Sequence, residues 1–190
     1  METSDFVETY ENYVKTMLTN GTEILRHINW THEFRDEGMP VPMPNYTNPA
    51  IEAVKSLARE YVERNGTSPD NPERYRKFYG LLKTLFMIEL NSKNTSAATL
   101  ERIDLDHNVT LQENNPEILQ YWFDLNIPKR LPAMRKKLDE YLGKYGRRKY
   151  LAPAYRELIK VDKEFARELF KKYGQNYNPR VAAKIEEALK

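Results

Sequence analysis

The sequence predicts an all-α fold, and three observations carry this prediction. Apolar residues recur at helical spacing along most of the 190 residues, and no stretch shows sustained strand alternation. Four Asn-Pro pairs precede apolar stripes, which suits helix starts because asparagine caps an N-terminus and proline tolerates the first helical position. The connections are short, so consecutive helices should pack antiparallel. The expected architecture is an α-solenoid of antiparallel helix pairs, HEAT/armadillo-like, although no strict sequence repeat is present.

The first predicted helices lie before residue 29. One covers about 4–20 and ends at an Asn-Gly step, and a shorter one covers 22–28. From residue 30 to 46 we expect an extended segment packed on a surface, because alternate prolines cannot sustain a helix. The proline-rich part of this segment, at about 36–47, is the only place to divide the chain, so we expect a single helical domain over 1–190.

Each Asn-Pro pair is expected to open a helix, and further apolar stripes lie between them. Gly146 suits the position after a helix end, and asparagines followed by x-Ser/Thr are interpreted as turn and cap residues rather than glycan sites. The expected helices cover about 48–65, 71–88, 96–105, 115–125, 129–144, 148–160, 162–173 and 178–189.

Composition limits the class of protein. The mean hydropathy is −0.78, and no apolar run approaches the roughly 20 residues that span a bilayer, so no membrane partner is expected. The first ten residues are acidic and have no apolar run, unlike a signal peptide. The absence of cysteine excludes a disulfide framework and a thiolate zinc site, and it is compatible with a reducing compartment. We therefore expect a cytoplasmic protein.

The sequence has no recognisable catalytic machinery. His32-Glu33 begins like a zinc-binding His-Glu-x-x-His motif, but Asp36 stands where the second histidine is needed. We therefore interpret the three histidines as surface or cap residues. Glycine-rich phosphate-binding loops and a Gly-x-Ser-x-Gly turn are also absent. We assign no catalytic residue, no metal ligand and no cofactor to this chain.

Charge is unevenly distributed. Residues 1–110 hold 12 basic and 17 acidic residues, whereas 111–190 hold 18 and 11. The basic excess is densest in 129–149, where a solvated helix face is the simplest interpretation. The functional interpretation rests on Arg147 and Lys149, because a helix starts here. Both side chains could converge beside the free N–H groups of a helix N-terminus, where an anion is favoured. Such a pair suits a carboxylate or a phosphate.

Several motifs, in order along residues 4–190, then resemble one known family. Gly146-Arg147-Arg148-Lys149-Tyr150, continuing through Pro153, Tyr155 and Arg156-Glu157-Leu158, resembles the Gly-Arg-x-Lys-aromatic run of the leukotriene A(4) hydrolase and aminopeptidase family. Asn114-Asn115-Pro116-Glu117-Ile118 with Trp122 resembles its Asn-Asn-x-Glu-Ile and tryptophan helix. Trp30 with the Pro-rich run 38–46 resembles its Gly-x-Pro-Pro-x-x-Pro-Asn-Tyr segment, and Tyr177-Asn178-Pro179 resembles the approach to its last helix.

This resemblance implies a right-handed superhelix that packs in cis on a thermolysin-like catalytic zinc-peptidase domain. It implies that the whole enzyme is a zinc aminopeptidase, in some members also an epoxide hydrolase, with the zinc held outside this chain. In that family the Arg and Lys of the motif hold the substrate carboxylate, as at the end of a short peptide. Carried over, these residues are Arg147 and Lys149. Arg148 stands where the family often has an apolar residue, so it either faces solvent or alters the pocket.

Two other functions stay open. A stand-alone helical-repeat scaffold would bind a partner protein through an exposed surface with an apolar patch. Nucleic-acid binding through residues 129–149 would require steep salt dependence and has no recognised motif, so a nucleic-acid partner is not expected. The favoured hypothesis is the C-terminal helical domain of a zinc aminopeptidase, which walls the substrate cleft, binds the substrate carboxylate and is not catalytic alone.

Overall fold

The structure is a computed structural model that describes residues 2–34, 37 and 48–190. Its regular elements in these ranges are all helices, which confirms the all-α prediction for this part of the chain. The chain divides into two compact units, Met1–Tyr46 and Thr47–Lys190, called here the N-terminal and C-terminal units. The proline-rich segment predicted at 36–47 lies outside the described residues except for Glu37. A single domain over 1–190 stays a prediction, and so does the right-handed sense of the superhelix.

The N-terminal unit contains α1 (Thr3–Met17), α2 (Gly21–Arg26) and α3 (Trp30–Phe34). α1 begins where the backbone N–H of Glu2 donates to the Asp5 carboxylate at 3.0 Å. α1 and α2 meet closely at Gly21, since a Cβ atom there would lie 2.1 Å from the carbonyl oxygen of Val14. Val14 is the one apolar residue that is fully buried among the described residues of this unit.

The extended segment predicted from residue 30 is wrong for Trp30–Phe34, which forms α3. The prolines that break helices begin only at residue 40. Before them, the Asn29 side chain accepts a hydrogen bond from the His32 backbone N–H at 3.2 Å, as a helix cap does. The Trp30 and Phe34 rings, one turn apart, stack at 5.8 Å, and Trp30 meets Tyr10 edge to face at 5.6 Å.

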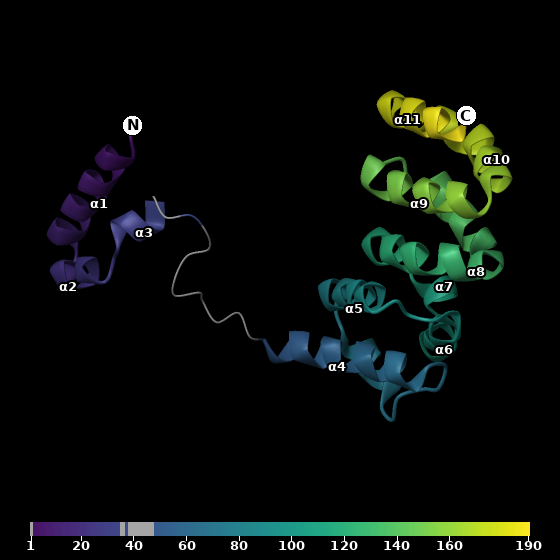
Figure 1. Cartoon of the computed structure of the whole chain (residues 1–190), viewed down its shortest axis with the longest axis horizontal. Helices are drawn as coiled ribbons and strands as arrows, with labels where there is room; N and C mark the ends of the chain where they lie inside the picture. Colours follow the sequence, from purple (N-terminus) through teal and green to yellow (C-terminus); the bar gives the residue numbers. More distant parts are fainter. Residues whose placement is uncertain (1, 35–36, 38–47) are drawn as a thin grey trace. The chain divides into compact units, whose positions relative to one another are not determined.

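The C-terminal unit is a stack of helices that contact one another largely in chain order. α4 packs on α5, α5 on α8, α8 on α9, and α9 on both α10 and α11 (Figure 1). This arrangement agrees with the predicted stacking of neighbouring helices. Its elements are α4 (Pro49–Arg64), η1 (Pro72–Lys77), α5 (Gly80–Ser92), α6 (Ala97–His107), α7 (Val109–Gln112), α8 (Pro116–Lys144), α9 (Arg148–Val161), α10 (Lys163–Tyr173), η2 (Gly174–Asn176) and α11 (Pro179–Leu189).

Asparagine caps place three of these helices as predicted. The side-chain oxygens of Asn48, Asn115 and Asn178 each accept from the backbone N–H two residues on, at 2.9 to 3.0 Å. The fourth pair differs, because Asn71 makes no side-chain cap and Pro72 opens the short 3-10 helix η1 instead of α5. The Asn71 carbonyl accepts from Arg74 Nε at 3.1 Å, which closes this tight turn.

Asparagines also end helices and turns in the left-handed conformation, as expected of turn and cap residues. Asn65, Asn94 and Asn108 have φ values of 39°, 49° and 53°. Gly146 follows the end of α8 as predicted, but it does not take the left-handed conformation of a glycine cap, since Gly66 is the glycine with positive φ in the described ranges.

α8 is two helices joined at a sharp kink. Arg130 has non-helical backbone angles (φ −140°, ψ 32°) between Pro128 and Pro132. The Tyr141 hydroxyl donates to the Pro116 carbonyl at 3.3 Å, so the second half returns to the start of the first. This fold-back agrees with the two separate helices predicted for 115–125 and 129–144. It brings the N-terminus of α8 close to the loop that leads into α9.

The core of the C-terminal unit is contributed by the inward faces of these helices. Trp122 is fully buried in the first half of α8, and its Nε1–H donates to the Thr110 hydroxyl at 3.0 Å. Thr110 in turn donates to the Asp104 carboxylate at 2.6 Å. This chain of hydrogen bonds fixes α6, α7 and α8 to one another and leaves no polar atom of the buried indole unpaired.

Candidate functional site

The predicted carboxylate site lies where the N-termini of α8 and α9 meet. Asn115 caps α8 with Pro116 at the first helical position, and Arg147 occupies the N-cap position of α9. The partial positive charge of each helix is concentrated at this end. The fold-back of α8 therefore places two helix N-termini beside one another at the predicted residues.

Lys149 is held by a carboxylate from the neighbouring helix. Its ammonium forms an ion pair with Glu117, whose other oxygen accepts from the Tyr150 hydroxyl at 2.7 Å. Hydrogen bonds from Lys149 and then from Tyr150 lower the pKa of the Glu117 carboxyl. The same hydrogen bond raises the pKa of the Lys149 ammonium. Both charges therefore persist at neutral pH.

Arg147 lies beside the same aromatic ring and has no carboxylate partner in the described ranges. Its guanidinium carbon is 5.6 Å from the centroid of the Tyr150 ring, and Lys149 Nζ is 5.9 Å from that centroid. The structure thus brings Arg147 and Lys149 together around Tyr150. Both side chains are exposed, whereas the Tyr150 ring is buried.

A tyrosine cluster fixes the loop that carries Arg147. The Tyr145 ring packs against Tyr150 at 5.8 Å and against Tyr141 at 5.1 Å, and its hydroxyl donates to the Asn114 carbonyl at 3.2 Å. These contacts tie the end of α8 to the segment that precedes α8. They also explain why the turn at Gly146 needs no left-handed glycine, because side-chain contacts hold Tyr145 in an extended conformation.

The arrangement can bind an anion. Arg147 and Lys149 carry two positive charges against the single negative charge of Glu117, so the site keeps a net positive charge next to a helix N-terminus. A carboxylate that bridges the two cations would neutralise it. Arg147 and Lys149 can therefore bind and orient an anionic ligand.

Most of the other basic residues of 129–149 are engaged within the fold. Arg135 pairs with Asp162, and Lys129 donates to the Thr95 carbonyl. Lys137 is buried to 9% exposure. Arg148 lines a groove against α11. The basic cluster therefore does not form one continuous basic surface.

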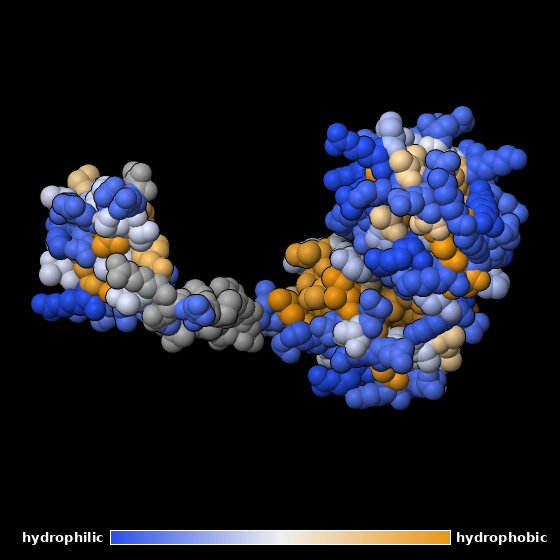
Figure 2. Space-filling view, turned by 45° about the horizontal axis from the view of Figure 1, so that its top comes forward, coloured by the Kyte–Doolittle hydropathy of each residue, from blue (hydrophilic) through white to orange (hydrophobic). Residues whose placement is uncertain are grey.

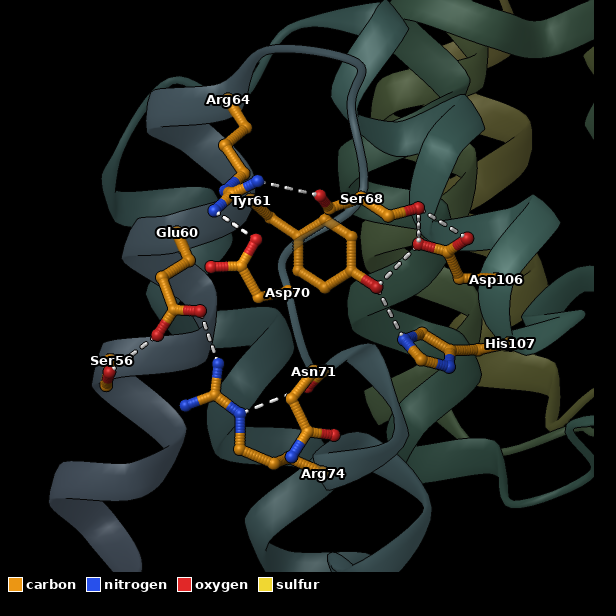
Figure 3. Close-up of polar contacts among 10 residues, drawn as sticks. All are labelled: Ser56, Glu60, Tyr61, Arg64, Ser68, Asp70, Asn71, Arg74, Asp106 and His107. Carbon is orange, nitrogen blue, oxygen red and sulfur yellow. Dashed lines mark hydrogen bonds and ion pairs between the residues drawn. The ribbon is translucent and has the colours of Figure 1, made fainter.

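A polar network around His107 was missed by sequence reasoning (Figure 3). The Asp106 carboxylate accepts from the hydroxyls of Tyr61 at 2.9 Å and Ser68 at 2.8 Å, and His107 Nε2 lies 2.8 Å from the Tyr61 hydroxyl. Since the carboxylate only accepts, Tyr61 donates to it and His107 Nε2–H donates to Tyr61. The expectation of a surface or cap histidine is wrong for His107, because its ring stacks on Tyr75 at 4.4 Å.

This network joins α4, the loop after it and the end of α6. When Nε2 of His107 carries the proton, Nδ1 is a buried acceptor atom that has no hydrogen-bond partner in the described part of the chain. Burial therefore lowers the pKa of His107 to about 4, despite the nearby Asp106 charge, and Arg76, Lys83 and Arg102 lower it further. No local pattern indicated this network, since Tyr61 and His107 are 46 residues apart in the chain.

No group of three or more His, Cys, Asp or Glu side chains in the described ranges is arranged to hold a metal ion. No helix in those ranges has the length and apolar character that crossing a bilayer requires.

Comparison with known proteins identifies the family. The family described as "Leukotriene A4 hydrolase, C-terminal" matches residues 78–189. Leucine aminopeptidase 2 of Saccharomyces cerevisiae is 26% identical and covers 100% of this chain, which spans 31% of that relative. Leucine aminopeptidase 2 of Neosartorya fischeri is 25% identical over 87% of this chain, which spans 27% of it.

Solved structures agree with this assignment. The native leukotriene A4 hydrolase of Saccharomyces cerevisiae matches 99% of this chain and 32% of its own, with a TM-score of 0.75 and 23% identity. A second structure of the native yeast enzyme matches with the same TM-score and 25% identity. The chain thus spans about a third of the length of the relatives it matches. It belongs to the leukotriene A(4) hydrolase C-terminal family.

Proposed function

We propose that this chain forms the C-terminal helical region of a zinc aminopeptidase, and that Arg147 and Lys149 bind the terminal carboxylate of a short peptide substrate. The observation that carries this proposal is the Arg147 guanidinium, which has no carboxylate partner in the described part of the chain and lies with Lys149 around Tyr150 at the start of α9. Family membership and the leucine aminopeptidase relatives support the activity of the whole protein.

The two cations would act differently. Glu117 already orients the Lys149 ammonium, so Lys149 offers a fixed positive charge with hydrogens left to donate. Arg147 has no competing carboxylate among the described residues, so its planar guanidinium can pair with both oxygens of a substrate carboxylate. If the substrate is held by its C-terminus, the distance from this point to the peptide bond that is cut would set the length of the peptides that are accepted.

The zinc and the residues that cleave the peptide would lie outside this chain, in a zinc-peptidase domain joined in cis. An apolar surface of the C-terminal unit supports such packing. Figure 2 shows hydrophobic surface gathered where α4 and α5 lie, and on α5 Leu81 and Ile88 are 69% and 39% exposed. Large exposed apolar patches mark interaction surfaces. A cytoplasmic location belongs to this proposal and is compatible with the absence of cysteine.

Packing on a further domain can be tested in the full gene product. Leu81→Asp is expected to reduce the yield of folded, active enzyme, because it places a charge in the proposed interface. Leu105→Asp is the matched control, since Leu105 is 67% exposed on α6. Equal effects of the two substitutions would argue against an interface on α5.

Substrate binding is tested with Arg147→Ala in the full gene product. Loss of a charged hydrogen bond costs roughly 1.5–3 kcal/mol, so kcat/KM for tripeptides should fall by roughly ten- to a hundredfold. For a tripeptide whose terminal carboxylate is amidated, Arg147→Ala should change kcat/KM little, because the amide cannot pair with Arg147 in the parent enzyme either. Arg148→Ala serves as the control and should change kcat/KM by less than about twofold. Equal losses for the acid and the amide would remove Arg147 from carboxylate binding.

The alternative is a stand-alone helical-repeat scaffold that binds a partner protein. The stacked helices and the exposed apolar residues of α5, Leu81 and Ile88, favour this second candidate. The intact mass of the gene product in its source cells separates the two functions. A product several times heavier than 22.5 kDa supports the aminopeptidase, whereas a product of about this mass supports the scaffold.

A further inference from the structure

A groove runs along the seam between α9 and α11, and neither Arg147 nor Lys149 lines it. It encloses about 270 Å³. The buried side chains of Tyr155, Val181 and Ile185 form part of its floor. Two small residues, Ala152 and Ala188, leave it open at the sides. The groove is therefore shaped to receive apolar side chains from a ligand that lies along the two helices.

The charged residues that line the groove all carry the same sign. Arg148 and Arg156 lie two turns apart on α9, about 12 Å at 1.5 Å per residue. Lys184 lies on α11. Arg148 and Lys184 form no ion pair with any described residue, and Arg156 donates from Nε to Glu157 at 3.0 Å, which leaves its terminal nitrogens available. No acidic residue lines the groove.

We infer that this groove docks an acidic amphipathic α-helix of a partner protein. Two packed helices with an apolar seam receive the apolar stripe of a third helix, whose anchors recur at i, i+3 or i+4, and i+7. Cations on both walls and two turns apart match acidic residues that flank such a stripe on both sides. A single anionic head group could not bridge Arg148 and Arg156, which start about 12 Å apart along α9. This inference does not depend on the proposed peptidase function.

The groove gives Arg148 a role that the sequence motif left open. Arg148 occupies the variable position between Arg147 and Lys149. The backbone turns into α9 at this point, so neighbouring residues of the motif serve different surfaces. Arg147 and Lys149 lie around Tyr150, whereas Arg148 lines the groove on the α11 side.

The test uses the 190-residue protein and a synthetic helix. The probe is a fluorescein-labelled peptide of leucine, alanine and glutamate, about 18 residues or five turns long, with leucines at i, i+3 and i+7 and glutamates on both flanks. A counterpart has every glutamate replaced by lysine. Anisotropy titrations at 150 mM salt should give saturable binding of the acidic peptide only, and backbone amide shifts should change over 148–159 and 181–188.

Matched variants separate the groove from general charge. Lys184→Glu should raise the Kd of the acidic peptide by at least about tenfold, as expected when an interfacial charge is reversed. Lys171→Glu makes the same charge change at an exposed site on α10 and should alter the Kd by less than about twofold. Ala188→Leu should block the groove, whereas Ala183→Leu, exposed on the same helix but outside the groove, should not. Lys184→Gln repeats the charge test if Lys184→Glu does not fold.

Three results would overturn the inference. One is the absence of saturable binding of the acidic peptide. Another is equal weakening by Lys184→Glu and Lys171→Glu, which would mean attraction by net charge alone. The third is binding of dodecanoate or of phosphatidylserine vesicles to the groove without binding of the peptide, which would assign it to a lipid-like anion or a membrane surface.

Discussion

Acid should destabilise the C-terminal unit through His107. The ring is neutral in the folded protein, with Nε2–H donated to Tyr61 and a buried Nδ1 that has no acceptor in the described ranges for a second proton. Its folded pKa of about 4 lies below the ordinary value of 6.5. The unfolded chain therefore binds a proton more readily. The stability that neutral His107 contributes is complete above pH 6.5 and is lost as the pH falls from 6.5 toward 4.

The magnitude follows from these two pKa values. Between pH 7.5 and pH 5 a fully shielded histidine would lose about 2 kcal/mol of unfolding free energy. Since the His107 ring is partly exposed, we expect about 1–2 kcal/mol. Asp124 acts in the opposite sense, because burial raises its pKa to about 6 and protonation then favours the folded state. A variant at His107 is needed to separate the two effects.

The assay is urea unfolding at pH 7.5 and pH 5, followed by Trp122 fluorescence in a Trp30→Phe background. Trp122 is the buried tryptophan of the C-terminal unit, so the signal reports that unit alone. His107→Gln should lose about 1–2 kcal/mol less stability on acidification than the parent. His27→Gln, at an exposed position on the end of α2, should behave as the parent does. Identical losses in His107→Gln and the parent, or an NMR titration of the His107 ring near 6.5, would refute the reasoning.

Two further substitutions test packing in the same unit by urea unfolding. Thr110→Val leaves the buried Trp122 Nε1–H without an acceptor and should lower the free energy of unfolding by about 2–3 kcal/mol. Thr110→Ser keeps the oxygen and should lower it clearly less. Equal losses of unfolding free energy would show that the hydrogen bond is not the cause. Gly143→Ala would place a Cβ atom 2.8 Å from the Tyr173 ring and should cost about 1–3 kcal/mol. The same substitution in a Tyr173→Ala background should cost much less, and an unchanged cost would contradict a clash with the ring.

Local signals in the sequence were sufficient for most helices. Asn48, Asn115 and Asn178 cap helices where the Asn-Pro pairs indicated, since a cap needs only the residues within one turn. The start of α9 beside Arg147 and Lys149 could also be predicted, because Gly146 marks the break between α8 and α9. The extended segment predicted at Trp30–Phe34 was wrong because aromatic contacts with α1 add to a short local cap and favour a helix. The helix predicted from Asn71 was wrong because a short 3-10 helix begins at Pro72 instead.

The residues of the carboxylate site could be predicted from the sequence, but their geometry could not. A Gly-Arg-x-Lys run at a helix start indicates an anion site, and the resemblance to the aminopeptidase family implies its ligand. The ion pair of Lys149 with Glu117 arises only because α8 folds back at Arg130 and returns its N-terminus to α9. Residues separated by about thirty positions leave no periodic signal that could reveal such a pairing.

By itself, the sequence determined the all-α class, most helix boundaries, the family and the two cations at the start of α9, because these depend on short-range spacing and on ordered motifs. The tertiary structure alone decided three things: that Lys149 is held by Glu117 while Arg147 has no carboxylate partner among the described residues, that Arg148 lines a different groove, and that His107 is a packed, neutral histidine. The physical reason is common to all three. Burial and pairing are set by which distant segments meet, and that is fixed only when the helices pack.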